Sequence, residues 1–578
     1  MDTNSSFFGS DSSSVVPRFQ PSEIVLETTI GMGEFGIVLK VGSIVLANDE
    51  TDSKEQVLRQ ELAKSCVCHE SIDTFRSSDS NYCPSPPRRG SASMELSPRD
   101  TPHAMLLVIK QIRKDLYPKK RIEAAKDLAR EAKLLARLQQ LYDGGTNHPN
   151  IISIRGIVSS PGTPEFGILL DRLHLTLTEL SSDWKKRQSL IVEMLSKRRR
   201  KRTSTLLSAA KSIPNQVVGT LFGVSQTVGE FWNGTNGDAS TTATFMDEAQ
   251  ADATPTRTTK RASPEALLLL GERVLALLDV SEGMGYLHHH KILYRDLKTE
   301  NVARTIPPKT STAPNGFLQD FDQQRLQIFD FGLAKECKLV DRLQNAVPSE
   351  FYETYKMTGM TGTMRIMAPE VIQCKAYGLS VDVYSFGICM WEVFTGTKCN
   401  FLSAAEICDT KQTVRPKLPV VYDPGTDEGS VGMPKELQGL MQVCWHEDPT
   451  RRPSFVEISK ILFSCLAQVY KQSLGPQQEE QEQDDAEQEQ LQKSNTNSSF
   501  LSAGIQKAKS GMAPLKNSCA GVGDLWKKIP ISPNRKQKQW QRYDGLDTGS
   551  TSSSDLLSDS ARFWSRLEAL RASGLLDD

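Results

Sequence analysis

Apolar positions along the chain fall into stretches of two kinds. Residues 24–41 alternate apolar and other side chains around a glycine-rich turn, and short apolar runs at 105–110 and 166–171 are typical of buried strands. Two later stretches repeat apolar residues at helical spacing. One covers about 121–141, and the other follows Ser263 and Pro264, a serine cap with proline at the first helical position. The pattern predicts strands in the first part of the chain and long helices after them.

Polar intervals interrupt this pattern. Residues 1–22 are Ser-rich and predicted to be disordered, and we expect insertions at about 48–104, 181–263 and 305–325. Residues 477–492 alternate Gln and Glu, and we predict a disordered tail over 466–578 with one short docking helix at 560–576. Without the insertions, the ordered unit is predicted to be residues 23–465.

Composition narrows the class of protein. The chain has 578 residues, a formal net charge of −1 and eleven scattered cysteines, with no apolar core near its start. This disfavours a secretory signal and a disulfide framework and favours an intracellular, reducing compartment. No apolar run approaches the ~20 residues that a membrane span needs.

The chemistry is concentrated in residues 294–301, Tyr-Arg-Asp-Leu-Lys-Thr-Glu-Asn, and in Asp330-Phe331-Gly332. Asp296 is a candidate base for a hydroxyl proton, and Lys298 a fixed cation facing a phosphate. Asn301 and Asp330 offer the hard oxygen ligands that Mg²⁺ prefers. This set is what transfer of a phosphoryl group from a nucleotide to a hydroxyl requires.

A glycine loop, Gly31-x-Gly33-x-x-Gly36, lies in the first strand region. Dinucleotide-binding folds share this spacing, but there the third glycine opens a helix. Here Gly36 opens Ile37-Val38-Leu39, a β-branched extended run, so we predict strand, loop, strand. Backbone amides of such a loop can approach phosphates, and Val38 is expected to pack on an adenine.

These motifs, in this order, resemble those of eukaryotic protein kinases. The resemblance implies an α+β, two-lobed fold with a small β-rich lobe, a larger helical lobe and long disordered insertions. It also implies that Lys110 holds the nucleotide phosphates and pairs with a glutamate on the next helix; Glu131 is the first candidate and Glu123 the second. By the same register, Leu170 is the gatekeeper and Asp171 begins the adenine-contacting segment.

The subclass follows from further motifs. Lys298 with Thr363 in Gly-Thr-Met-Arg-Ile-Met-Ala-Pro-Glu resembles the serine/threonine type, and Cys444-Trp445 with Arg452-Pro453 resembles the tyrosine-kinase-like group. The resemblance implies Asp382 behind the catalytic loop and an ion pair between Arg452 and Glu370. It implies ATP and Mg²⁺ as cofactors, protein Ser/Thr hydroxyls as substrates and intracellular signalling as the setting. Thr354, Thr358 and Thr361 are candidate sites for an upstream activating kinase, beside Arg295.

Other interpretations stay open. A pseudokinase or scaffold would bind partners through the insertions and tail, although no catalytic residue is lost. Six consecutive cations at 197–202 favour a nuclear-localisation signal or a solvated basic loop about equally, and nucleic-acid binding is the less favoured reading. We therefore expect a cytoplasmic protein with access to the nucleus. Cys66, Cys68, His69 and Cys83 match no common zinc spacing.

Overall fold

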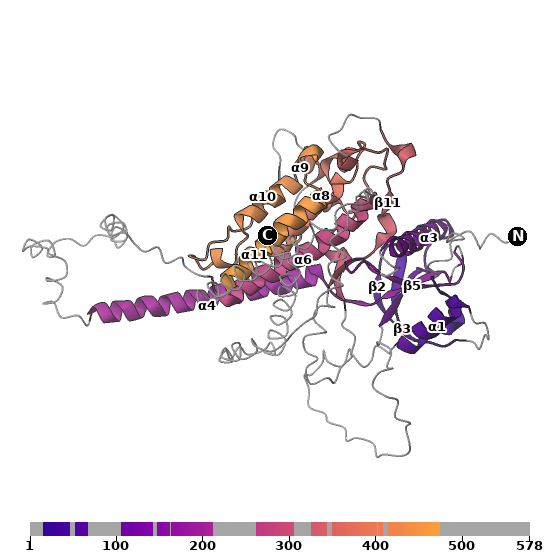
Figure 1. Cartoon of the computed structure of the whole chain (residues 1–578), viewed down its shortest axis with the longest axis horizontal. Coiled ribbons are helices and arrows are strands. Elements are labelled where there is room, and N and C mark those ends of the chain that lie inside the picture. The colour runs from indigo at the N-terminus through magenta and orange to yellow at the C-terminus, as the bar shows by residue number, and fades with distance from the viewer. Residues whose placement is uncertain are drawn as a thin grey trace, which may run out of the picture.

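The computed structural model describes residues 16–46, 53–66, 106–142, 147–161, 163, 165–211, 262–305, 325–343, 350–400, 403–408 and 414–473. Predictions for residues 306–324 and for the chain beyond 473, including the helix at 560–576, lie outside this part. In Figure 1 strands β2, β3 and β5 lie with α1 and α3 in one lobe, and α6, α8, α10 and α11 form the other.

The smaller lobe is built on a sheet of six strands in the order β1-β5-β6-β4-β3-β2, in which only the β1–β5 pair is parallel. The strands are β1 (Arg18–Phe19), β2 (Ile24–Met32), β3 (Gly36–Ile44), β4 (Leu107–Ile112), β5 (Ile154–Val158) and β6 (Gly167–Asp171). Strand, loop, strand around the glycines is therefore confirmed. The long helix α3 (Pro118–Leu141) packs its buried leucines and alanines against the sheet.

The larger lobe is mostly helical. Its main helices are α4 (Leu177–Lys211), α6 (Pro264–His289), α8 (Ser380–Thr395), α10 (Lys435–Cys444) and α11 (Phe455–Ser473), with short helices α7 (Pro369–Ile372) and α9 (Ala404–Cys408). Small strands at the junction with the other lobe are β7 (Leu173–Thr176), β8 (Ile292–Leu293), β9 (Val302–Thr305), β10 (Leu326–Ile328) and β11 (Lys335–Glu336). Residues 294–301, here called the catalytic segment, lie between two of these strands. β8 precedes the segment and β9 follows it, so the two strands hold its ends.

The predicted boundaries of the ordered unit are wrong at its start. Residues 1–22 were expected to be disordered, yet Arg18 and Phe19 pair with β5, and Phe19 is buried against Val41 and Leu107. Burial of one aromatic side chain contributes about 2–3 kcal/mol, which explains why this segment is held on the sheet. At the other end, α11 continues past 465 to Ser473.

Two expected insertions begin with helices. Within 48–104, α1 (Lys54–Ser65) starts at Ser53, whose Oγ accepts a hydrogen bond from the Gln56 amide, and Leu62 joins the sheet core. Within 181–263, α4 continues as helix through Lys211. Trp184 and Ile191 are buried against the large lobe, so the start of this interval is part of the folded unit.

Candidate active site

Lys110 lies in β4, in register with Val38 on β3 and Ile168 on β6. Its Nζ contacts the two carboxylate oxygens of Glu131 at 2.9 and 2.8 Å and Asp330 Oδ1 at 2.7 Å. Glu131 is buried on the inner face of α3, whereas Glu123 is exposed. Glu131, the first of the two candidates, is thus the ion-pair partner, and the pair joins the two lobes through Asp330.

The charges of this cluster stabilise each other. Burial disfavours the charged amine, but Glu131 and Asp330 outweigh it and raise the pKa of Lys110. Burial likewise disfavours the Asp330 carboxylate, but the Lys110 ammonium outweighs this and lowers its pKa. Burial raises the pKa of Glu131 in spite of the nearby ammonium, so the groups whose ionised forms are favoured near pH 7 are Lys110 and Asp330.

Asp296 is held from several sides. Lys298 Nζ donates to its Oδ2 at 2.6 Å and to Thr363 Oγ1 at 2.9 Å. Thr363 donates to Oδ1 through its amide at 3.0 Å and its hydroxyl at 2.7 Å, and Asn301 Nδ2 donates to Oδ2 at 2.9 Å. These contacts fix the carboxylate in one orientation and bring the cation and the threonine of the two motifs together, as the serine/threonine resemblance implies.

The catalytic segment is anchored from behind by Asp382 on α8. This fully buried carboxylate accepts hydrogen bonds from the Tyr294 amide at 2.9 Å and the Arg295 amide at 2.8 Å, and His288 Nε2 lies 3.0 Å from it. Arg295 has a positive φ of 69°, a conformation in which a side chain is strained. The carboxylate therefore compensates for a backbone turn that the chain would not otherwise favour.

Tyr294 stands where most kinases have histidine. Its ring is buried edge-to-face on Phe331, with centroids 5.3 Å apart, and its hydroxyl donates to the Phe329 carbonyl at 2.5 Å. The tyrosine thus supports the segment that carries Asp330. Nothing in its position obstructs Asp296.

The two proposed metal ligands fit a magnesium ion. Asn301 donates its amide group to Asp296, which leaves the amide oxygen Oδ1 for a cation. Asp330 has a positive φ of 62°, and one side-chain oxygen is held by Lys110. Among the described residues, no cluster of three or more His, Cys, Asp or Glu side chains could hold a metal ion. Water and the phosphates of a nucleotide would have to complete the coordination, as is usual for Mg²⁺.

The glycine loop between β2 and β3 is open. A Cβ added at Gly33 would meet only the Gly36 carbonyl, at 3.7 Å, and one added at Gly31 would meet only Val38, at 3.8 Å. No side chain therefore obstructs the backbone at Gly31 and Gly33, and the Gly33 amide donates to the Gly36 carbonyl at 2.8 Å, which fixes the turn. Asp171 at the end of β6 receives both its ion-pair contacts from Arg155, at 2.8 and 2.7 Å. Its carboxylate is thus engaged by the small lobe.

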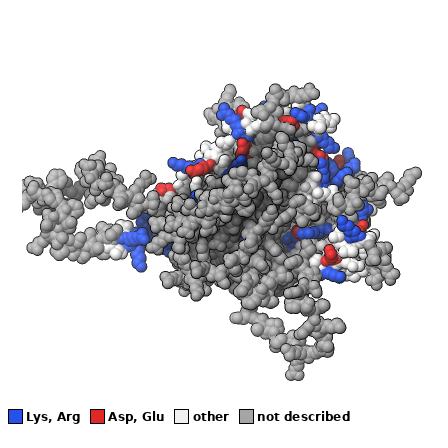
Figure 2. All heavy atoms as spheres, in the orientation of Figure 1, with Lys and Arg blue, Asp and Glu red and all other residues white. Residues whose placement is uncertain are grey.

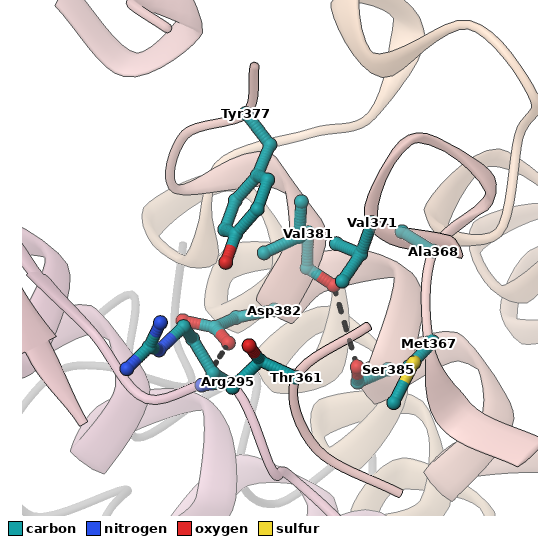
Figure 3. Close-up of a pocket in the computed structure, with 9 residues that line it drawn as sticks. All are labelled: Arg295, Thr361, Met367, Ala368, Val371, Tyr377, Val381, Asp382 and Ser385. Atoms are coloured by element: carbon teal, nitrogen blue, oxygen red, sulfur yellow. Dashed lines mark hydrogen bonds between the residues drawn. The ribbon is translucent and has the colours of Figure 1, made fainter. Parts of the chain in front are cut away.

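Residues 330–370, here called the activation segment, contact the catalytic segment through Arg295. Arg295 donates to the Leu333 carbonyl at 2.7 Å and to Thr358 Oγ1 at 3.1 Å. Arg295 also lines a small cavity with room for about one water molecule. Its other lining residues include Thr361, Tyr377, Asp382 and Ser385 (Figure 3). The expected Arg452–Glu370 ion pair is confirmed, at 2.5 and 3.0 Å.

One network was not foreseen from the sequence. Arg365 contacts Glu300, next to the catalytic residues, at 2.6 Å and Glu392 on α8 at 3.1 Å, and Lys398 contacts Glu300 at 2.7 Å. The printed sequence offers no spacing rule that would pair these residues, because they lie 27 and more positions apart. The two cations neutralise Glu300 beside the catalytic segment.

Comparison with known proteins agrees with this geometry. The family model "protein tyrosine and serine/threonine kinase" matches residues 94–462, which is more than half of the chain. The match begins after the glycine loop. The pairing of β3 with β4, which sets Val38 beside Lys110, joins that loop to the matched region.

Curated relatives carry related names. The chain is similar to serine/threonine-protein kinase STY17 of Arabidopsis thaliana, 34% identical over 33% of this chain and 27% of that protein. It is 32% identical to serine/threonine/tyrosine-protein kinase HT1 of the same plant, over 33% of this chain and 40% of that protein. It is 30% identical to human mitogen-activated protein kinase kinase kinase 11, over 34% of this chain and 20% of that protein. The alignments thus span less than half of each relative's length.

Proposed function

Since the chain belongs to the protein tyrosine and serine/threonine kinase family, we propose that it is an active serine/threonine kinase, which transfers the γ-phosphate of ATP to protein hydroxyls. One observation carries the proposal. Asp296, Lys298 and Thr363 form one hydrogen-bonded group, within contact of Asn301. The proposed base Asp296, the cation Lys298 and the proposed metal ligand Asn301 are thus held next to one another. Lys110 also contacts the other proposed residues, Glu131 and Asp330.

Asp296 acts as the base in this proposal. One carboxylate oxygen accepts the proton of the substrate hydroxyl as its oxygen attacks the γ-phosphorus in line with the leaving β-phosphate oxygen. Lys298, held by Asp296 and Thr363, faces the transferring phosphoryl group and offsets charge that develops on its oxygens. The new bond joins the substrate oxygen to the γ-phosphorus, the bond to the β-phosphate oxygen breaks, and ADP leaves as the phosphoryl group is transferred.

In this proposal the nucleotide is bound mainly by residues of the small lobe. Lys110, fixed by Glu131, holds the α- and β-phosphates under the amides of Gly31, Gly33 and Gly36. Val38 packs on the adenine, and the backbone near Asp171 contacts its edge. Asn301 and Asp330 would hold Mg²⁺, which neutralises phosphate charge when bound. ATP and Mg²⁺ are the general cofactors of the family.

The acceptor class is assigned as serine and threonine because Lys298 and Thr363 occupy the space beside the base. The names of the relatives support it, although HT1 is also named for tyrosine. Thr358 lies beside Arg295, so a phosphate added there by an upstream kinase would gain a charge-assisted hydrogen bond.

We also propose a cytoplasmic protein with access to the nucleus through residues 197–202. Seven cysteines of the described part form no disulfide, which suits a reducing compartment; they are Cys337, Cys374, Cys389, Cys399, Cys408, Cys444 and Cys465. Within that part, no helix is both long and apolar enough to cross a membrane. Imaging of a fluorescent fusion, beside one with Lys197, Arg198 and Arg200 changed to Gln, tests this location.

The test of activity uses the purified full chain with γ-labelled ATP, Mg²⁺ and mixed peptides that contain Ser, Thr or Tyr. Label on Ser or Thr that is absent from Lys110→Met is expected. Label on Tyr alone would overturn the acceptor class. Absence of label despite measured ATP binding and a phosphorylated activation segment would favour the scaffold interpretation.

A further inference from the structure

The far end of α4 carries an exposed basic cluster, defined here as Lys197, Arg198, Arg199, Arg200, Lys201 and Arg202, all exposed to solvent. Six consecutive helical residues turn through more than one full circle, so cations surround this end of the helix. Figure 1 shows α4 extending away from the large lobe, and Figure 2 shows blue side chains gathered at that end.

Most of these charges lack a counter-ion in the described part of the chain. Lys197 contacts Glu193 at 2.7 Å, and Arg199 contacts Asp427 at 3.2 Å. No described carboxylate forms an ion pair with Arg198, Arg200, Lys201 or Arg202. Adjacent like charges repel one another, so an acidic partner would stabilise this end of the helix.

The helix is rigidly attached before it reaches the cluster. Arg187 and Trp184 both contact Glu272 of α6, at 2.6 and 2.9 Å. Ser196 Oγ donates to Asp427 at 3.0 Å, and Arg199 donates to the Gly425 carbonyl at 2.9 Å. The loop at 422–427 therefore fixes the place where the basic cluster begins.

The same loop marks where the described part of the chain ends. Tyr422 donates its hydroxyl to Gln472 on the last turn of α11 at 2.9 Å. Tyr422 and Asp427 are five residues apart, a separation of at most about 18 Å even if extended. The last turn of α11 and Arg199 of the basic cluster thus contact the same short loop, and the chain continues beyond Ser473 from there.

The sequence that follows is acidic. Between 474 and 492 it has seven carboxylates and no lysine or arginine; they are Glu479, Glu480, Glu482, Asp484, Asp485, Glu487 and Glu489. From Ser473 to Asp484 there are eleven residues, a length of chain that can reach at most about 36–40 Å. That range covers the basic cluster, which itself extends only about 9 Å along the helix axis.

We propose that residues 479–489 of the same chain dock on the basic cluster of α4. Seven negative charges meet a cluster of six cations, four of which form no ion pair in the described part of the chain, and the short tether makes the encounter intramolecular, with an effective concentration in the millimolar range. The contact is electrostatic, so salt weakens it.

Zero-length carbodiimide cross-linking of the full chain tests the proposal, because it joins a lysine amine to a carboxylate in direct contact. Cross-links from Lys201 to residues 479–489 are expected at low salt, and they should be lost at high salt. The Lys197–Glu193 pair supplies an internal positive control. Mixing isotope-labelled and unlabelled protein distinguishes links within one chain from links between two.

Arg198, Arg200 and Arg202 changed together to Gln keep both reactive lysines and remove three charges. Each exposed charge contributes only modestly, so the loss of three should lower the Lys201 link about five- to tenfold. The matched control changes three exposed cations of α3, Lys119, Lys120 and Lys126, to Gln and should leave the link unchanged. Lys201 links that avoid 479–489, links that join two chains, or links indifferent to the arginine changes would overturn the proposal.

Discussion

Replacement of Asp382 by Asn tests how the catalytic segment is held. The carboxylate accepts from the amides of Tyr294 and Arg295, with His288 at 3.0 Å, and it is fully buried. Asparagine keeps the shape but has one acceptor oxygen. Whichever way the amide turns, its NH₂ group faces a buried backbone N–H that has lost its partner.

The magnitude follows from these contacts. One unsatisfied buried donor costs about 1–3 kcal/mol, and the remaining hydrogen bonds lose the strength they gain from a charged acceptor, about 1 kcal/mol more. We therefore expect Asp382→Asn to lower the free energy of unfolding by about 2–4 kcal/mol and the melting temperature by about 4–8 °C. The strained turn at Arg295 should relax, so phosphotransfer should fall with it.

Thermal unfolding followed by circular dichroism measures the first effect, and steady-state phosphotransfer below the melting temperature measures the second. Ser385→Ala on the same helix is a matched control, because its hydroxyl serves only two backbone carbonyls. An Asp382→Asn protein with unchanged melting temperature and activity would refute the anchoring role.

Three further predictions concern other parts of the molecule. Glu131→Gln removes a carboxylate that holds Lys110 and should lower kcat/KM about 10- to 100-fold in a phosphotransfer assay, whereas exposed Glu123→Gln should not. His148 accepts a hydrogen bond from the Asn150 amide, and burial lowers its pKa from 6.5 to about 3, so protonation favours the unfolded chain as pH falls below 6.5. Stability should therefore drop by up to about 1.4 kcal/mol per pH unit between 6.5 and about 3, and urea unfolding of His148→Gln should show a shallower slope. Gly362 has a φ of 106°, and a Cβ there would overlap the Arg295 carbonyl, so Gly362→Ala should reduce both melting temperature and activity; equal values for the two proteins would contradict this.

The candidate catalytic residues could be predicted from the sequence because they lie in short motifs. Asp296, Lys298 and Asn301 are within six residues, and Asp330 begins a three-residue motif, so little three-dimensional information was needed. Glu131 was harder to assign, because the helix offers two glutamates, Glu123 and Glu131, and only the packing of α3 shows which one points inward. The Arg365 network depends on residues brought together by tertiary structure, and no local pattern announces it.

The fold was predicted where apolar patterns were long and missed where they were short. The β1 strand is two residues long and pairs with β5 about 140 positions later, so local sequence could not reveal it. Two helices did leave signals. Ser53 with Gln56 three residues on is a capping pattern, and Leu177, Leu180, Trp184 and Ile191 form a helical stripe. The basic run at 197–202 and the polar residues after it favoured an insertion over a helix.

The most direct test of the central claim compares wild type with Asp296→Asn in two measurements, ATP affinity and the rate of phosphate transfer to a Ser/Thr peptide. Asparagine keeps the size of the side chain but cannot take the hydroxyl proton, so the rate should fall by about 10²–10⁴-fold while the Kd for ATP changes little. A variant that transfers phosphate as fast as wild type would contradict the assignment of Asp296 as the base.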